Sequence, residues 1–125
     1  MQSILLVGVG GFLGAVARFG MARFVYSLGS VPFPLATLVI NVSGSFALGF
    51  VYRYFENHPY LSSIVLFAGI GFMGAFTTFS TFSIETLNLV RKGAIAMATL
   101  NVMLSVGLCL LGVYGGDSLG RAIGK

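Results

Sequence analysis

The sequence predicts an all-α integral membrane protein with four transmembrane helices. Hydrophobic residues make up 57% of the 125-residue chain and charged residues only 8%, whereas a soluble domain carries about a quarter charged residues. The charged side chains are also placed so that four long stretches have none: 1–17, 24–52, 57–84 and 93–116. Each stretch meets or approaches the roughly 20 apolar residues that a helix needs to cross the hydrocarbon core of a bilayer.

The first span is expected at residues 3–25. Gly10 and Gly14 lie four residues apart in it, and this spacing is typical of a helix face that packs closely against another helix. A dinucleotide-binding glycine loop is excluded, because the glycine spacing differs from that motif and no strand precedes it.

The second span is expected at 33–54. Pro32 and Pro34 precede it, and proline suits the start of a helix. We expect Gly44, Ser45 and Gly49 to form its packing face. Asn41 is a polar side chain within this apolar span, and it is open to two interpretations: a hydrogen bond between helices, or a functional site.

The third span, expected at 61–90, is too long and too weak for one regular helix. Thirty residues of α-helix would extend about 45 Å, against a hydrocarbon core of about 30 Å. Its centre, residues 69–83, is rich in Gly, Ser and Thr, and each glycine weakens a helix by about 1 kcal/mol relative to alanine. The sequence therefore predicts a third helix broken in mid-membrane, where freed backbone groups must be buried in protein or line a wet cavity. Breaks of this kind bind ions in transporters.

The polar side chains of this third span require an explanation. They are five hydroxyls and one carboxyl: Thr77, Thr78, Ser80, Thr81, Ser83 and Glu85. A hydroxyl in a membrane helix usually bonds to a carbonyl one turn back, so each is weak evidence by itself. An acid within a span is by default a functional hypothesis. Glu85, however, lies within a turn or two of Arg91 and Lys92, which is compatible with a position near the membrane interface.

Phe79 and Phe82 are interleaved with these hydroxyls and lie three residues apart, on one face of a helix. An aromatic ring has a negative face and a positive edge. Two ring edges turned toward a pore would attract a small anion without binding it tightly. Without the surrounding hydroxyls, packing against lipid or protein would be the favoured interpretation.

The fourth span is expected at 94–116, with Gly107, Gly112 and Gly115 on its packing face. Cys109 is the only cysteine and lies inside this span, so disulfide bonding says nothing about the compartment. With four spans in 125 residues, we expect residues 1–125 to form a single domain.

The positive charges give almost no orientation signal. Four spans would place Arg18, Arg23, Arg91 and Lys92 on one side of the membrane and Arg53, Arg121 and Lys125 on the other. Orientation is normally set by an excess of Lys and Arg on the cytoplasmic side. The near balance has two interpretations: another signal fixes the topology, or the chain inserts both ways and pairs with an inverted copy. Because the basic residues stand at helix ends and form no stripe, a nucleic-acid partner is not expected.

The motifs together resemble those of the Fluc fluoride channels, also called CrcB proteins. The run from Gly74 to Glu85, GAFTTFSTFSIE, is similar to that family's third-helix signature. Residues 14–18, GAVAR, resemble the first-helix motif, and residues 37–44, TLVINVSG, resemble the second. Length, number of spans and motif order also agree, so the resemblance covers nearly the whole chain.

The resemblance implies a passive fluoride-selective channel that exports cytoplasmic fluoride and so confers fluoride resistance, in the bacterial plasma (inner) membrane. By position, Asn41, Phe79 and Phe82 would line the fluoride pathway. Ser80 and Thr81 would belong to a track of hydroxyls, with Arg18 at the wet entrance and Glu85 near the other end. In the fourth helix either Ser105 or Cys109 would face the pore, and the sequence does not decide between them.

The resemblance also implies the assembly and the cofactor. Family members form antiparallel, dual-topology dimers with two pores, and the partner would be an identical chain or a paralogue. The backbone carbonyls of Gly74 and Thr77 would hold a structural Na⁺ at the dimer interface. Carbonyl oxygens suit a hard cation such as Na⁺. Two departures from the family pattern, Ala36 and Ala75 in place of glycine, concern packing more than chemistry.

Two other functions fit the composition less well. A small multidrug-type exporter is also a four-helix protein, but its proton exchange needs a carboxylate in the first span, and this chain has none there. A non-transporting membrane assembly factor would explain the apolar helices but not the hydroxyls and acid around a weak helix. An enzyme is not expected, because the sequence offers no nucleophile–base pair or metal-ligand cluster.

Overall fold

The computed structural model describes residues 1–29, 31–56, 58 and 62–124, and every regular element in these residues is helical. Three helices are long and continuous: α1 (Gln2–Ser27), α2 (Leu35–Phe55) and α6 (Ile95–Ile123). The third span consists of α3 (Ser62–Ile64), the π-helix η2 (Val65–Met73), α4 (Gly74–Phe76) and α5 (Phe79–Arg91). Four segments are long and apolar enough to cross a membrane: Gln2–Ser27, Leu35–Phe55, Ser62–Arg91 and Ile95–Ile123. This confirms the prediction of a four-span all-α membrane protein.

The helix ends differ from the expected ranges in two places. The second helix begins at Leu35 rather than at residue 33, because Pro34 has non-helical dihedral angles and precedes the first turn. The fourth helix does not end at residue 116 but continues to Ile123. Polar residues there did not stop it, since Asp117 and Arg121 pair one turn apart on its surface, 2.9 Å between oxygen and nitrogen. Residue 61, the expected start of the third span, lies outside the described residues.

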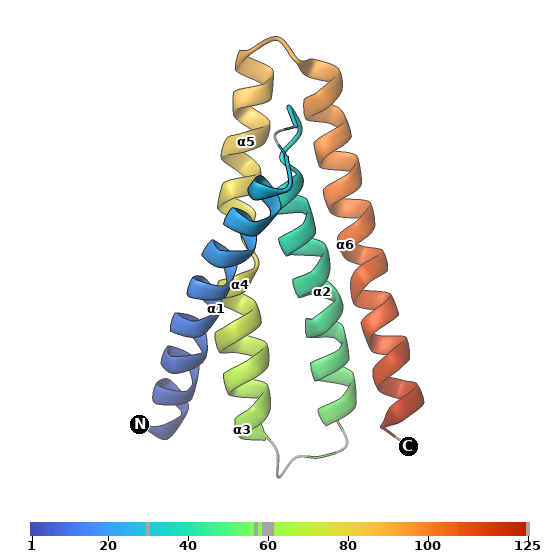
Figure 1. The fold of residues 1–125 in the computed structure, drawn as a ribbon. Coiled ribbons are helices and arrows are strands. Elements are labelled where there is room, and N and C mark those ends of the chain that lie inside the picture. The colour runs from blue at the N-terminus through green and yellow to red at the C-terminus, as the bar shows by residue number, and fades with distance from the viewer. Residues whose placement is uncertain (30, 57, 59–61, 125) are drawn as a thin grey trace.

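α1 begins and α6 ends at the same end of the molecule, where α2 also ends and α3 begins (Figure 1). The α1–α2 connection and the α5–α6 turn lie toward the other end. At the latter turn Gly93 has a φ of 74°, a left-handed conformation that glycine adopts freely when it ends a helix. The alternation of ends is that of a chain that crosses a membrane four times.

Close glycine contacts hold two pairs of segments together: α1 against η2, and α2 against α6. A Cβ atom built on Gly71 would lie 2.8 Å from the carbonyl oxygen of Val7, and one on Gly14 would overlap the carbonyl of Phe72. Between α2 and α6, Gly112 would bring a Cβ to 3.0 Å from the carbonyl oxygen of Val42. At such points the two backbones touch, so a side chain larger than hydrogen would require one of them to shift.

The expected packing glycines are mostly confirmed. Cβ atoms on Gly10, Gly14, Gly44, Gly49 and Gly112 would all contact a neighbouring element. The expectation for Gly107 was wrong, since a Cβ there would meet nothing within 4 Å. The fourth helix instead makes further close contacts with α2 at Gly116, where a Cβ would overlap the carbonyl of Phe46, and at Gly120. Both lie in or next to the turns by which this helix exceeds its expected length.

Between α4 and α5 the helical conformation is interrupted at Thr77 and Thr78. Thr77 has φ −74° and ψ 155°, and Thr78 has φ −149° and ψ 111°, so both are extended. The backbone amide of Thr81 then donates to the Thr78 hydroxyl, 3.2 Å away, which makes Thr78 the N-cap of α5. This interruption is where the candidate site is built.

Candidate functional site

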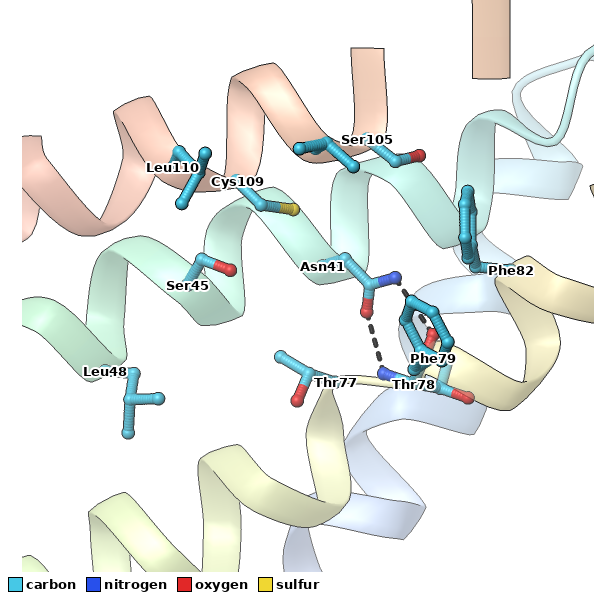
Figure 2. A pocket seen from close by; sticks show the side chains of 11 residues that line it. Asn41, Ser45, Leu48, Thr77, Thr78, Phe79, Phe82, Ser105, Cys109 and Leu110 are labelled. Carbon is cyan, nitrogen blue, oxygen red and sulfur yellow. Dashed lines mark hydrogen bonds between the residues drawn. The ribbon is translucent and has the colours of Figure 1, made fainter. Parts of the chain in front are cut away.

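Asn41 on α2 binds the main chain of Thr78 through both ends of its carboxamide (Figure 2). Its Nδ2 donates to the Thr78 carbonyl at 2.9 Å, and its Oδ1 accepts from the Thr78 amide at 2.7 Å. A carboxamide used in this way copies the hydrogen-bonding pattern of a peptide group. It stabilises extended backbone that would otherwise leave unpaired polar groups in an apolar environment.

The contact between Asn41 and Thr78 leaves nearby backbone carbonyls without the amide donors they would have in a continuous helix. In a continuous helix the Thr78 amide would bond to the carbonyl of Gly74, and the Thr81 amide to that of Thr77. Here the Thr78 amide donates to Asn41, and the Thr81 amide donates to the Thr78 hydroxyl. The carbonyls of Gly74 and Thr77 therefore lose their helical donors.

A cluster of hydroxyls surrounds Thr78, whose side chain is buried. The Thr78 Oγ1 donates to Thr81 Oγ1 at 2.9 Å and lies 3.3 Å from Ser80 Oγ. The Thr77 hydroxyl turns back to the carbonyl of Met73, 2.9 Å away. Ser80 and Thr81, the two residues of the expected hydroxyl track, therefore both contact the hydroxyl of a third residue, Thr78.

A cavity of about 320 Å³ lies beside the interruption, between α2, α5 and α6. It is lined by one amide, hydroxyls, a thiol, two phenylalanines and aliphatic side chains: Asn41, Ser45, Leu48, Thr77, Thr78, Phe79, Phe82, Ser105, Val106, Cys109 and Leu110. Figure 2 shows these side chains converging from separate helices. Both fourth-helix candidates, Ser105 and Cys109, are among them.

The two phenylalanines lie on the same side of α5 but in different environments. Their ring centroids are 5.3 Å apart, with 44° between the ring planes. Phe82 is buried, with 9% of its surface exposed, whereas Phe79 is 77% exposed. The arrangement gives the cavity one fixed aromatic wall and one ring that the protomer itself leaves uncovered.

Glu85 and Arg18 lie apart from this cavity; among the described residues, neither is part of its lining. The Glu85 carboxylate accepts a hydrogen bond from the Thr37 hydroxyl of α2, with 2.9 Å between the oxygens. Arg18 lies half-buried on α1. The structure therefore separates the seven expected pathway residues into Asn41, Phe79 and Phe82 at the cavity, the two hydroxyls beside it, and two outlying charged groups.

The chain matches the family model for the CrcB-like protein, described as camphor resistance (CrcB), over residues 5–117. The chain belongs to the CrcB family. A relative from Elusimicrobium minutum is 45% identical over 124 residues, covering 98% of this chain and 97% of that protein. Relatives from Idiomarina loihiensis and Ruminiclostridium cellulolyticum are 43% and 40% identical, covering 91% and 98% of this chain and 92% and 95% of theirs. All three carry the name fluoride-specific ion channel FluC, which describes a channel and not an enzyme.

In this CrcB chain the sequence did not assign a role to several residues that hold the site. Thr78 could have been recognised as an N-cap, because a threonine directly precedes a helical pattern. Thr37, the partner of Glu85, has no such signal, since the two residues are 48 positions apart. Asn101 and Thr86, whose side chains bond at 2.9 Å, are likewise paired only by the fold.

Proposed function

We propose that this protein is a passive, fluoride-selective channel in the bacterial plasma (inner) membrane, which lets accumulated fluoride leave the cytoplasm. The observation that carries the proposal is the convergence of Asn41, Phe79 and Phe82 on one cavity, in a chain whose near full-length relatives are named fluoride-specific channels.

The chemistry of the cavity suits a small anion that is costly to dehydrate. An ion pathway must replace water with polar groups that bind the ion well enough to admit it but not to trap it. The Asn41 amide has two N–H donors, and one of them is used on Thr78. We assign the other to fluoride, together with hydroxyls and the positive ring edges of Phe79 and Phe82. Ser80, Thr81, Arg18 and Glu85 would serve the approaches to this cavity.

We place the interruption of the third helix at the middle of the membrane. Thr77 and Thr78 lie near the centre of the segment Ser62–Arg91, and Asn41 satisfies the Thr78 main chain. Non-helical backbone at that depth is tolerated only when protein or a wet cavity meets its polar groups.

A structural Na⁺ fits the same place. The fit rests on the carbonyls of Gly74 and Thr77, whose helical donors are taken by Asn41 and by the Thr78 hydroxyl. Such carbonyl oxygens are suitable ligands for a hard cation. When bound, Na⁺ would supply positive charge that balances these carbonyls where two protomers meet.

The working unit in this proposal is an antiparallel pair, formed with a second copy or a paralogue. Two observations support it: Phe79 is 77% exposed in one protomer, and an apolar hollow on α1, α2 and the third span remains open, lined in part by Ala17, Met21, Phe72 and Phe76. The near balance of basic residues between the two sides also favours insertion in both orientations.

Proteoliposomes test the transport activity. Purified protein should release fluoride rapidly in the presence of a potassium ionophore, measured with a fluoride electrode, while chloride stays trapped. Release of chloride as fast as fluoride would contradict the proposal.

Added lysines test the topology. Two lysines beside Arg53 should drive that connection to the cytoplasmic side, and two beside Arg91 should drive the opposite orientation. Each variant alone should give little fluoride resistance, and co-expression should restore it. If a cysteine label near Lys125 in the otherwise unmodified chain reacts from one side only in sealed cells, the topology is fixed and the antiparallel pair is wrong.

A further inference from the structure

Asn101 on α6 is the most deeply buried polar residue of the described chain, with 2% of its surface exposed. A carboxamide has two donors and two acceptor sites, and leaving them unpaired in an apolar environment is costly. The residue therefore requires specific partners, although the sequence alone gives it no role.

Its partners form a directional chain of hydrogen bonds between two walls of the cavity. The Ser105 hydroxyl donates to Asn101 Oδ1 at 3.4 Å, and Asn101 Nδ2 donates to the Thr86 hydroxyl at 2.9 Å. The Thr86 hydroxyl in turn donates to the backbone carbonyl of Phe82 at 2.7 Å. Ser105 and Phe82, at the two ends of this chain, both line the cavity that contains Asn41.

These hydrogen bonds also link α5 to α6 next to Phe82, the buried residue of α5. The Thr86 hydroxyl both accepts from Asn101 and donates to the Phe82 carbonyl, so it connects the Phe82 backbone to a side chain of another helix. Ser83 provides an internal comparison. Its hydroxyl makes the same one-turn bond to the carbonyl of Phe79, 2.9 Å away, but on the exposed face of α5.

We propose that Asn101 is a positioning residue for the ion pathway, acting through Thr86 to fix Phe82 against Ser105. This inference rests on the proposed channel function. In it the Asn101–Thr86 bond sets the spacing of the aromatic and hydroxyl walls, and that spacing is what favours a small anion over a larger one. An ordinary bond between membrane helices, by contrast, would contribute only modestly to stability and leave anion selectivity unchanged.

The test compares Asn101→Leu and Thr86→Val with Thr86→Ser and Ser83→Ala. The first two remove the bond while keeping the number and branching of the side-chain heavy atoms. Thr86→Ser keeps the hydroxyl, and Ser83→Ala removes the matched bond on the exposed face. In proteoliposomes, Asn101→Leu and Thr86→Val should each lower the ratio of fluoride to chloride efflux by about tenfold, and the double variant should be no worse than either alone. Thr86→Ser and Ser83→Ala should keep the ratio of the unmodified protein.

A second measurement reports on the ring itself and does not depend on transport. With 4-fluorophenylalanine at position 82, the ¹⁹F resonance should shift in Thr86→Val and stay in place in Ser83→Ala. Thr86→Val also keeps the test decisive if Asn101→Leu does not yield folded protein. If the unmodified channel is active and Thr86→Val changes neither the selectivity ratio nor the resonance, the proposed role of Asn101 is wrong, while the channel proposal stands. An unmodified protein that releases no fluoride would overturn the channel proposal, and this inference with it.

Discussion

The two long parts of the third span, η2 and α5, are held in the molecule by different means. η2 lies backbone to backbone against α1, through contacts such as that of Gly71 with Val7. α5 and its N-cap are joined to their neighbours by three side-chain hydrogen-bonded contacts: Thr78 with Asn41, Glu85 with Thr37, and Thr86 with Asn101.

The two kinds of contact, backbone packing at η2 and side-chain hydrogen bonds at α5, have different consequences. Backbone contact at glycines excludes water and fixes the distance between helices closely. Directional side-chain bonds hold a helix at a few points and leave the face between them open. In this protein the cavity lies on the hydrogen-bonded part, beside α5, where polar groups can serve both structure and an ion.

Gly14→Ala should disrupt the contact between α1 and η2, and we expect the largest loss of stability from this substitution. Its Cβ would overlap the carbonyl of Phe72, and relieving that overlap requires two backbones to separate, at about 3 kcal/mol or more. Gly8→Ala on the same helix meets nothing within 4 Å and should be neutral or slightly stabilising. The temperature at which the sizing-column peak is lost in detergent measures both. Equal midpoints for the two variants would show that the contact at Gly14 is not restrictive.

Asn41→Asp should abolish fluoride flux near neutral pH. Aspartate can still accept from the Thr78 amide, but it offers no donor to the Thr78 carbonyl or to an anion. Losing a buried donor to Thr78 costs about 1–3 kcal/mol, and the added negative charge repels fluoride. Ser43→Ala, which removes a hydroxyl bonded within α2, is the control. Efflux from Asn41→Asp equal to that of the unmodified protein would exclude Asn41 from the pathway.

Substitution of the two phenylalanines should distinguish the ring that is buried in the protomer from the ring that is exposed. Phe79→Leu and Phe82→Leu keep apolar volume but remove the ring quadrupole, so both should lower fluoride efflux by at least about tenfold. Phe82→Leu should also lower the unfolding midpoint in detergent, because Phe82 is 9% exposed within the protomer. Phe79 is 77% exposed there, so Phe79→Leu should lower the midpoint only in the proposed dimer, where the partner would cover the ring. Undiminished efflux in both variants, with the dimer intact on a sizing column, would assign the rings to packing.

Thr37→Val should give the smallest effect. It removes the hydroxyl that donates to Glu85 but leaves the cavity lining unchanged, so it should cost about 1 kcal/mol. Thr37→Ser keeps the donor and should behave as the unmodified protein. The unfolding midpoint measures the difference, and a Thr37→Val midpoint equal to that of Thr37→Ser would show that this bond does not hold α5.

Local composition was sufficient to predict the number and approximate positions of the spans. Each uncharged stretch overlaps one of the four candidate membrane helices, and the glycine spacing in residues 3–25 indicated the contact that Gly14 makes. The sequence did not predict the π-helical conformation of η2, which lies against α1, nor the extension of α6 to Ile123. Both belong to regions where packing against a second helix, and not intrinsic propensity, sets the conformation.

The sequence by itself determined that the chain crosses the membrane four times, because the free energy of placing apolar side chains in lipid depends on each segment alone. It also identified Asn41, Phe79 and Phe82 as residues to explain. The tertiary structure decided that Asn41 binds the Thr78 main chain, 37 positions away, and that Thr37 binds Glu85, 48 positions away. Such pairs depend on how each helix is rotated and crossed against its neighbours, which the glycine contacts between backbones set.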